Sequence, residues 1–194
     1  MRFVTLYLRS RQVPAALAIA LVSAVLVAQL RSESADPQQG FVSTLLALAL
    51  GLAVLGYGLG GPDAELERTA AIAWFPRRAA QVLAMAVVVA GGVLLSSAVP
   101  AGVILRDAAG LAGLTALTAT LLGRQLAWTL PVAWTGAATV LAPVADAPVL
   151  RALSWPMQAP DDLTASIIAC GLGVGGLVLY AALGCRVERG RQGS

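Results

Sequence analysis

The side chains that could support chemistry in this chain lack the partners that such chemistry needs. Serine, threonine and two cysteines supply nucleophilic atoms, but the 194 residues include no histidine and no lysine, because all 13 basic residues are arginines. A hydroxyl or thiol nucleophile needs a base to take its proton, and histidine is also the commonest metal ligand. No pair of carboxylates lies within an apolar segment. We therefore expect no catalytic residues, no metal site and no enzymatic activity of the chain itself.

Two glycine-rich stretches match the dinucleotide-binding pattern G-x-G-x-x-G. They are Gly56, Gly58 and Gly61, and Gly171, Gly173 and Gly176. That pattern needs a preceding strand and a βαβ unit, whereas both stretches lie within or at the end of long apolar segments. Small residues four apart, such as Gly56 with Gly60 and Gly171 with Gly175, instead allow close helix packing. We expect a packing role for these glycines.

Residues 126–144 combine aromatic and polar side chains in an apolar segment. Proline within a membrane helix frees a backbone carbonyl and kinks the helix, so we expect a kink at Pro131. With Trp128 and Trp134 on either side, this segment is a candidate lining for an apolar substrate path. Five threonines in this segment and the one before it are expected to bond to the backbone one turn back: Thr115, Thr118, Thr120, Thr129 and Thr135.

A short polar stretch at 61–79 has the pattern of an amphipathic helix. Pro62 suits the first helical position, and the acidic residues that follow lie near the positive end of the helix dipole. We expect a helix at about 62–74 that ends before Pro76, with Arg77 and Arg78 at the start of the next apolar segment. A rigid amphipathic helix of this kind suits docking into a groove of a partner protein, and a plain interfacial connector is the alternative. The candidate docking residues are Asp63, Glu65, Leu66, Glu67 and Arg68.

The elements that carry these residues are six apolar segments, so the predicted fold is an all-α integral membrane protein. Hydrophobic residues make up 58% of the chain and its mean hydropathy is +0.81, beyond the range of a soluble domain. A bilayer core of about 30 Å requires about 20 apolar helical residues. The predicted transmembrane helices are about 13–30, 41–60, 79–99, 104–122, 126–144 and 163–184, preceded by an amphipathic elbow helix at 1–12. Together they form a single domain, residues 1–194.

Arginine is distributed unevenly between the loops. With six spans and a cytoplasmic N-terminus, three arginines lie outside: Arg31, Arg106 and Arg151. Ten lie in the cytoplasm: Arg2, Arg9, Arg11, Arg68, Arg77, Arg78, Arg124, Arg186, Arg189 and Arg191. This asymmetry follows the positive-inside rule and predicts that both termini are cytoplasmic.

Three further expectations concern residues near the ends of the segments. Arg106 and Asp107 are expected to form a neutralised pair close to the outer interface, with the fourth span starting before Arg106. Trp155 in the external segment 145–162 is expected to rest at the membrane interface. Cys170 and Cys185 are separated by 15 helical residues, or about 22 Å, too far for a disulfide, so we expect them to serve in packing.

The chain resembles the membrane subunits, or permeases, of bacterial ABC-type exporters of the type V, two-polypeptide class. The resemblance covers essentially the whole chain and is carried locally by PDAELERTAAIAWFPRR at 62–78, LLGRQLAWTLPVAW at 121–134 and LSWPMQAPDD at 153–162. These segments are similar to those of small permeases from GC-rich bacterial genomes. The chain is shorter than is typical of that class and has almost no soluble extension.

The resemblance implies a transport subunit in the bacterial inner membrane that is driven by a separate ATPase. The segment at 62–74 would dock on that ATPase, which would hold the ATP and magnesium, while this chain binds no cofactor. A second permease copy or a related permease, together with membrane lipids, is also implied as a partner, and nucleic acid is not. The cargo would be a drug, lipid or peptide of apolar or amphipathic character. The alternative is a membrane scaffold or immunity subunit that transports nothing.

Overall fold

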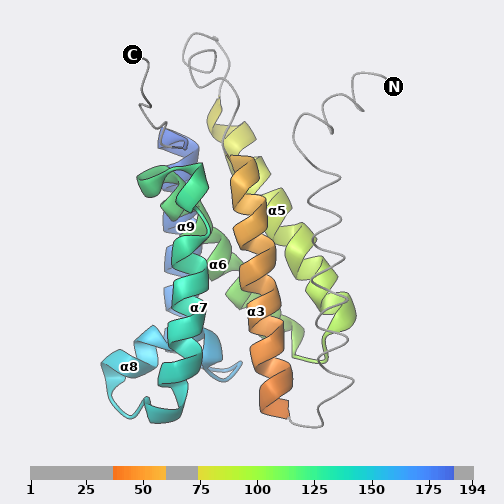
Figure 1. Cartoon of the computed structure of the whole chain (residues 1–194), viewed down its shortest axis with the longest axis vertical. Helices are drawn as coiled ribbons and strands as arrows, with labels where there is room; N and C mark the ends of the chain where they lie inside the picture. Colours follow the sequence, from red (N-terminus) through yellow and green to blue (C-terminus); the bar gives the residue numbers. More distant parts are fainter. Residues whose placement is uncertain (1–36, 60–73, 186–194) are drawn as a thin grey trace, which may run out of the picture.

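The computed structural model describes residues 37–59 and 74–185, and every regular element in these two ranges is helical. Five long helices dominate: α3 (Pro37–Gly56), α5 (Trp74–Ser96), α6 (Ala101–Leu122), α7 (Thr129–Leu141) and α9 (Leu163–Leu183). The short elements are η1 (Tyr57–Leu59), η2 (Arg124–Leu126), η3 (Ala142–Val144), α8 (Pro148–Leu153) and η4 (Trp155–Met157). Successive long helices alternate in direction along one common axis, and α8 lies at the end where α7 finishes (Figure 1).

Four of these helical segments are long and apolar enough to cross a membrane, so the chain has the character of a multi-pass membrane protein. They are Trp74–Ser96, Ala101–Leu122, Arg124–Val144 and Leu163–Leu183, and α3 adds a shorter apolar stretch, Gln38–Val54. Five of the six predicted spans therefore correspond to observed helices. The predicted span at 13–30 and the elbow helix at 1–12 lie outside the described residues.

Helix α6 is the centre of the bundle, because it contacts α3, α5, α7 and α9. Leu111, Ala116 and Ala119 on α6 are fully buried. The surrounding helices expose large apolar side chains on their outer faces, as Val87 on α5 and Val140 on α7 illustrate. This arrangement suits a helix bundle whose outer surface faces lipid.

The tightest packing joins α6 to α9 through glycines. A Cβ atom at Gly113 would lie 2.6 Å from the Cα atom of Gly173, and one at Gly176 would collide with the backbone of Gly113. The packing role predicted for the second glycine stretch is therefore confirmed. However, the pair expected to provide it, Gly171 with Gly175, faces open space, and Gly173 and Gly176 provide the contact. The spacing alone did not identify which helix face is buried.

The first glycine stretch also packs closely, at Gly56. A Cβ atom there would lie 2.8 Å from Thr115 Cγ2 and 3.2 Å from Ala127 Cβ. Gly60, its predicted companion, lies outside the described residues. The contact brings the end of α3 against α6.

The five threonines bond to their own helices or to the turn before them, as predicted. Thr115, Thr118 and Thr120 donate to the carbonyls four residues earlier at 2.6–2.9 Å. Thr135 donates to Pro131 at 2.7 Å, and Thr129 donates to Leu126, also at 2.7 Å. These hydroxyl groups are thus satisfied locally, which allows them to lie in an apolar bundle.

Two predicted effects of proline are wrong. Pro76 was expected to lie between two helices, but it lies within α5 (Trp74–Ser96); the helix predicted before it is outside the described residues. Pro131 was expected to kink a span, but it lies in the first turn of α7, which begins at Thr129. Amide groups in a first turn have no partner within their helix, so proline fits there without breaking a hydrogen bond.

Candidate functional site

The three residues predicted to line a substrate path occupy different environments, Trp128 just before α7 and the other two within it. Pro131 is buried, whereas Trp128 is 40% exposed. Trp134 is half-buried, and its indole Nε1 donates to the Leu153 carbonyl at 3.0 Å. None of the three lines the surface hollow beside residues 157–159 or the gap between α3 and α6. The structure therefore does not gather the three around one cavity, and Trp134 instead holds the end of α8 through its bond to Leu153.

The Arg106–Asp107 pair lies in the second turn of α6, which starts before Arg106 as predicted. Arg106 Nε donates to Asp107 Oδ1 at 2.9 Å, and both side chains are almost fully buried. The remaining guanidinium nitrogens donate to three backbone carbonyls: Ala159 at 2.9 Å, Gln158 at 3.1 Å and Trp155 at 3.5 Å. The pair therefore does more than neutralise itself, because Arg106 holds the segment that leads into α9.

Trp155 is fully buried, which corrects the prediction that it rests at the membrane interface. Its six-membered ring lies against Gly110 of α6, where a Cβ atom would collide with it. Short helices α8 and η4 turn the chain back into the bundle, and η4 contacts α3, α7 and α9. The aromatic ring consequently fills space between helices instead of facing lipid headgroups.

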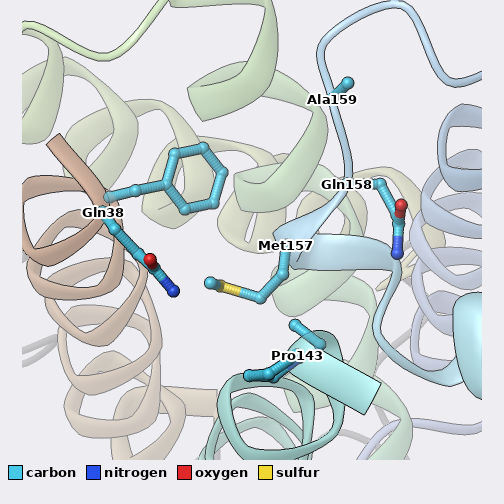
Figure 2. A pocket seen from close by; sticks show the side chains of 7 residues that line it. Gln38, Pro143, Met157, Gln158 and Ala159 are labelled. Carbon is cyan, nitrogen blue, oxygen red and sulfur yellow. The ribbon is translucent and has the colours of Figure 1, made fainter. Parts of the chain in front are cut away.

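A surface hollow of about 370 Å³ lies beside this segment. It is bounded by the first turn of α3, by η3 and by residues 157–159, and Figure 2 shows the side chains of Gln38 and Met157 directed toward each other across it. Its lining is uncharged: Gln38, Phe41, Ala142, Pro143, Met157, Gln158 and Ala159. Such a lining offers amide hydrogen bonds and apolar contact but no nucleophile or acid.

A second gap lies between α3 and the start of α6 and has no room for a water molecule. Thr44 lines it, and the hydroxyl groups of Thr44 and Ser97 are hydrogen-bonded to each other at 3.0 Å. Asp107 lines the same gap. The interior between these two helices is therefore filled.

At the opposite end of the bundle, side chains of α5 and α9 bind the backbone that directly precedes residues 60–73. Tyr180 of α9 donates its buried hydroxyl to the Leu59 carbonyl at 2.5 Å, and Gln81 of α5 donates to the Gly58 carbonyl at 2.7 Å. Element η1 is thus attached to two separate spans. The sequence analysis did not predict either contact, although both polar side chains stand out in otherwise apolar segments.

The candidate docking residues are not part of the described structure. Asp63, Glu65, Leu66, Glu67 and Arg68, and with them the predicted helix at 62–74 up to Ala73, lie outside the described ranges. Residue 74, the last of that prediction, belongs to α5.

The two cysteines are free thiols in different surroundings. Cys185 Sγ donates to the Ala119 carbonyl at 3.3 Å, in agreement with a packing role. Cys170 is exposed on the outer face of α9, so the packing role predicted for it is wrong within this chain. No group of three or more metal-ligating residues comes together in the ranges 37–59 and 74–185.

No protein-family model, curated protein or solved structure shows a significant match to the chain.

Proposed function

We propose that this chain is the membrane-spanning permease subunit of an ATP-driven exporter, which moves an apolar or amphipathic substrate with energy from a separate ATPase. The observation that carries the proposal is the attachment of η1 to both α5 and α9. A force applied to the loop at 60–73 would reach two spans through the Leu59–Tyr180 and Gly58–Gln81 hydrogen bonds. A partner that binds this loop could therefore move helices at a distance.

The composition supports an external source of energy. A nucleotide-binding P-loop requires a lysine that reaches the β- and γ-phosphates, and this chain has none. ATP and magnesium are thus assigned to the partner, and the acidic and apolar residues at 63–68 are assigned to docking on it.

The filled interior of the bundle favours a path between two copies of the chain or between the chain and a related permease. The gap between α3 and α6 cannot hold water, and α7 presents Trp128 on its outer surface. An aromatic and apolar outer face suits a lipid, drug or peptide as cargo. The chain is assigned to a bacterial inner membrane, with both termini cytoplasmic.

Co-purification tests the proposal most directly. The tagged chain, extracted in detergent from its native host, is expected to retain an ATPase whose activity rises when apolar peptides, drugs or lipids are added. Glu67→Arg should reduce ATPase recovery several-fold, because it reverses a charge in the docking segment. Asp161→Arg is the matched control, since Asp161 is an exposed acid at the opposite end of the bundle.

Failure to recover any ATPase, or equal recovery with both variants, would contradict the proposal. It would favour the alternative of a scaffold or immunity subunit without transport activity.

A further inference from the structure

Residues 153–159 are attached to the bundle by very few polar contacts, and one side chain makes most of them. The guanidinium group of Arg106 donates to the carbonyls of Trp155, Gln158 and Ala159. All three acceptors are backbone atoms within five residues of one another, so the loss of Arg106 would release all of them together. Such charge-assisted bonds are stronger than neutral ones. Asp107 holds the guanidinium in place from the other side.

Residues 153–159 also place the ring of Trp155 in a space that is open only because residue 110 is glycine. Trp155 is fully buried, and its ring occupies the space that a side chain at position 110 would fill. Its indole Nε1 is also buried and has no hydrogen-bond partner in the part of the chain that the structure describes. A buried donor without a partner carries an unrecovered desolvation penalty. The buried position of Trp155 is therefore less stable than one in which Nε1 has an acceptor, and it depends on the other contacts of the segment.

The chain around the segment is short or irregular in structure. Gln158 and Asp162 have extended backbone angles between η4 and α9, and α8 before them is only six residues long. Val149 on α8 is 69% exposed, so α8 is not buried in the bundle. Within the part of the chain that the structure describes, one other side chain of a long helix bonds to the segment: Trp134 donates to the Leu153 carbonyl.

We propose that residues 153–159 form a plug that closes this end of the bundle. Trp155 fills the space beside Gly110, and Arg106 is the latch, the side chain that holds the plug in place. Release of the latch withdraws Trp155 from Gly110 and opens a hollow of the size of an indole ring next to the Arg106–Asp107 pair. This device belongs to the chain alone and does not depend on the proposed ATPase partner.

Cysteine accessibility tests the plug. In a background of Cys170→Ala and Cys185→Ser, Ser154→Cys places a nearly isosteric thiol within the plug at a position that is fully buried. The purified protein in detergent is treated with a membrane-impermeant maleimide, which reaches both ends of the bundle. We expect slow labelling when Arg106 is intact and labelling at least about tenfold faster in Arg106→Gln, the change expected from the loss of a hydrogen bond to a charged group.

Matched variants separate release of the plug from general loosening. Arg124→Gln removes an exposed arginine and should leave the rate unchanged. Thr115→Cys places a thiol at a buried position deeper in α6 and should stay unreactive in every background. Arg106→Lys keeps the charge beside Asp107 but lacks the planar fork, so labelling should rise at least about threefold. It provides the test if Arg106→Gln does not fold.

Three results would overturn the proposal. The first is labelling of Ser154→Cys, with Arg106 intact, as fast as that of an exposed thiol at Asp161→Cys. The second is a change of less than twofold in the labelling rate of Ser154→Cys in both Arg106 variants. The third is labelling of Thr115→Cys that rises together with that of Ser154→Cys.

Discussion

Glycines of the same helix have opposite roles in this bundle, and the difference is set by what each one faces. Gly175 and Gly176 are neighbours in α9, yet a Cβ atom at Gly176 would collide with the backbone of Gly113, while one at Gly175 would meet nothing within 4 Å. Backbone atoms cannot move aside as a flexible side chain does. The contact between α6 and α9 therefore depends on glycine at position 176, as it does at position 113, whereas position 175 is free to carry a side chain.

This pair of glycines yields a matched prediction. Gly176→Ala should push α9 away from α6 and lower the free energy of unfolding by about 1–3 kcal/mol, the usual cost of overpacking. Gly175→Ala should leave stability unchanged or raise it by up to about 1 kcal/mol, because alanine is the better helix former. Thermal unfolding of the two variants in the same detergent measures the difference. Equal melting temperatures would show that the two helices do not pack through Gly176.

Individual residues were predictable from the sequence when their partners are local. The threonine bonds were predicted correctly because a hydroxyl reaches the carbonyl of the preceding turn in any helix. The burial of Trp155 was not, because its partner, Gly110, lies far earlier in the chain and only the folded bundle brings them together. The three carbonyl acceptors of Arg106 were missed for the same reason, since backbone carbonyls have no signature in a sequence.

At the scale of whole elements, the hydrogen bond between α9 and η1 joins the last long helix to the end of the range 37–59. Tyr180 is 2% exposed and its hydroxyl bonds to the Leu59 carbonyl. Gln81 makes a parallel attachment from α5. The end of α3 is consequently held by two helices that follow it in the chain.

Removal of one hydroxyl group tests this attachment. Tyr180→Phe keeps the ring but leaves the Leu59 carbonyl without this donor, so stability should fall by about 1–3 kcal/mol. Thr139→Val is the control, because the hydroxyl of Thr139 bonds only to the Gly136 carbonyl of its own helix and its loss should have little effect. Chemical unfolding in mixed detergent micelles compares the two. A loss in Thr139→Val as large as that in Tyr180→Phe would remove the basis for a special role of η1.

Helix identity was predictable to a greater degree than helix boundaries. Long apolar runs located the four candidate spans and the shorter apolar helix α3, since few other structures can satisfy their backbone in lipid. Boundaries were harder to predict where proline lies: Pro76 lies within α5 and not before it, and Pro131 lies in the first turn of α7 and not in the middle of a span. Proline is equally compatible with a first helical turn, and the sequence around it does not distinguish the two positions.

Across the whole molecule, charge is separated between the two ends of the bundle. The beginning of α5 and the element η2 carry Arg77, Arg78 and Arg124, and no acidic residue of the described ranges lies there. The other end carries all the acidic residues in the described ranges together with two arginines: Asp107, Asp146, Asp161, Asp162, Arg106 and Arg151. This separation supports the proposed orientation, because basic ends of membrane helices remain in the cytoplasm.

The orientation can be tested at the end of α9. The Arg78 guanidinium lies over Gly184, since a Cβ atom there would be 2.7 Å from Arg78 Cζ, and α9 thus ends beside the start of α5. A reporter that is active only in the cytoplasm, fused after Ser194, should therefore be active, because that junction follows the basic end. The same reporter fused to a chain truncated after Pro160 should be inactive, since Pro160 belongs to the acidic end. The reverse pattern would place the basic end outside the cytoplasm, and with it the loop at 60–73 that the proposed ATPase must reach. The two fusions accordingly test the orientation and a requirement of the proposed mechanism in one measurement.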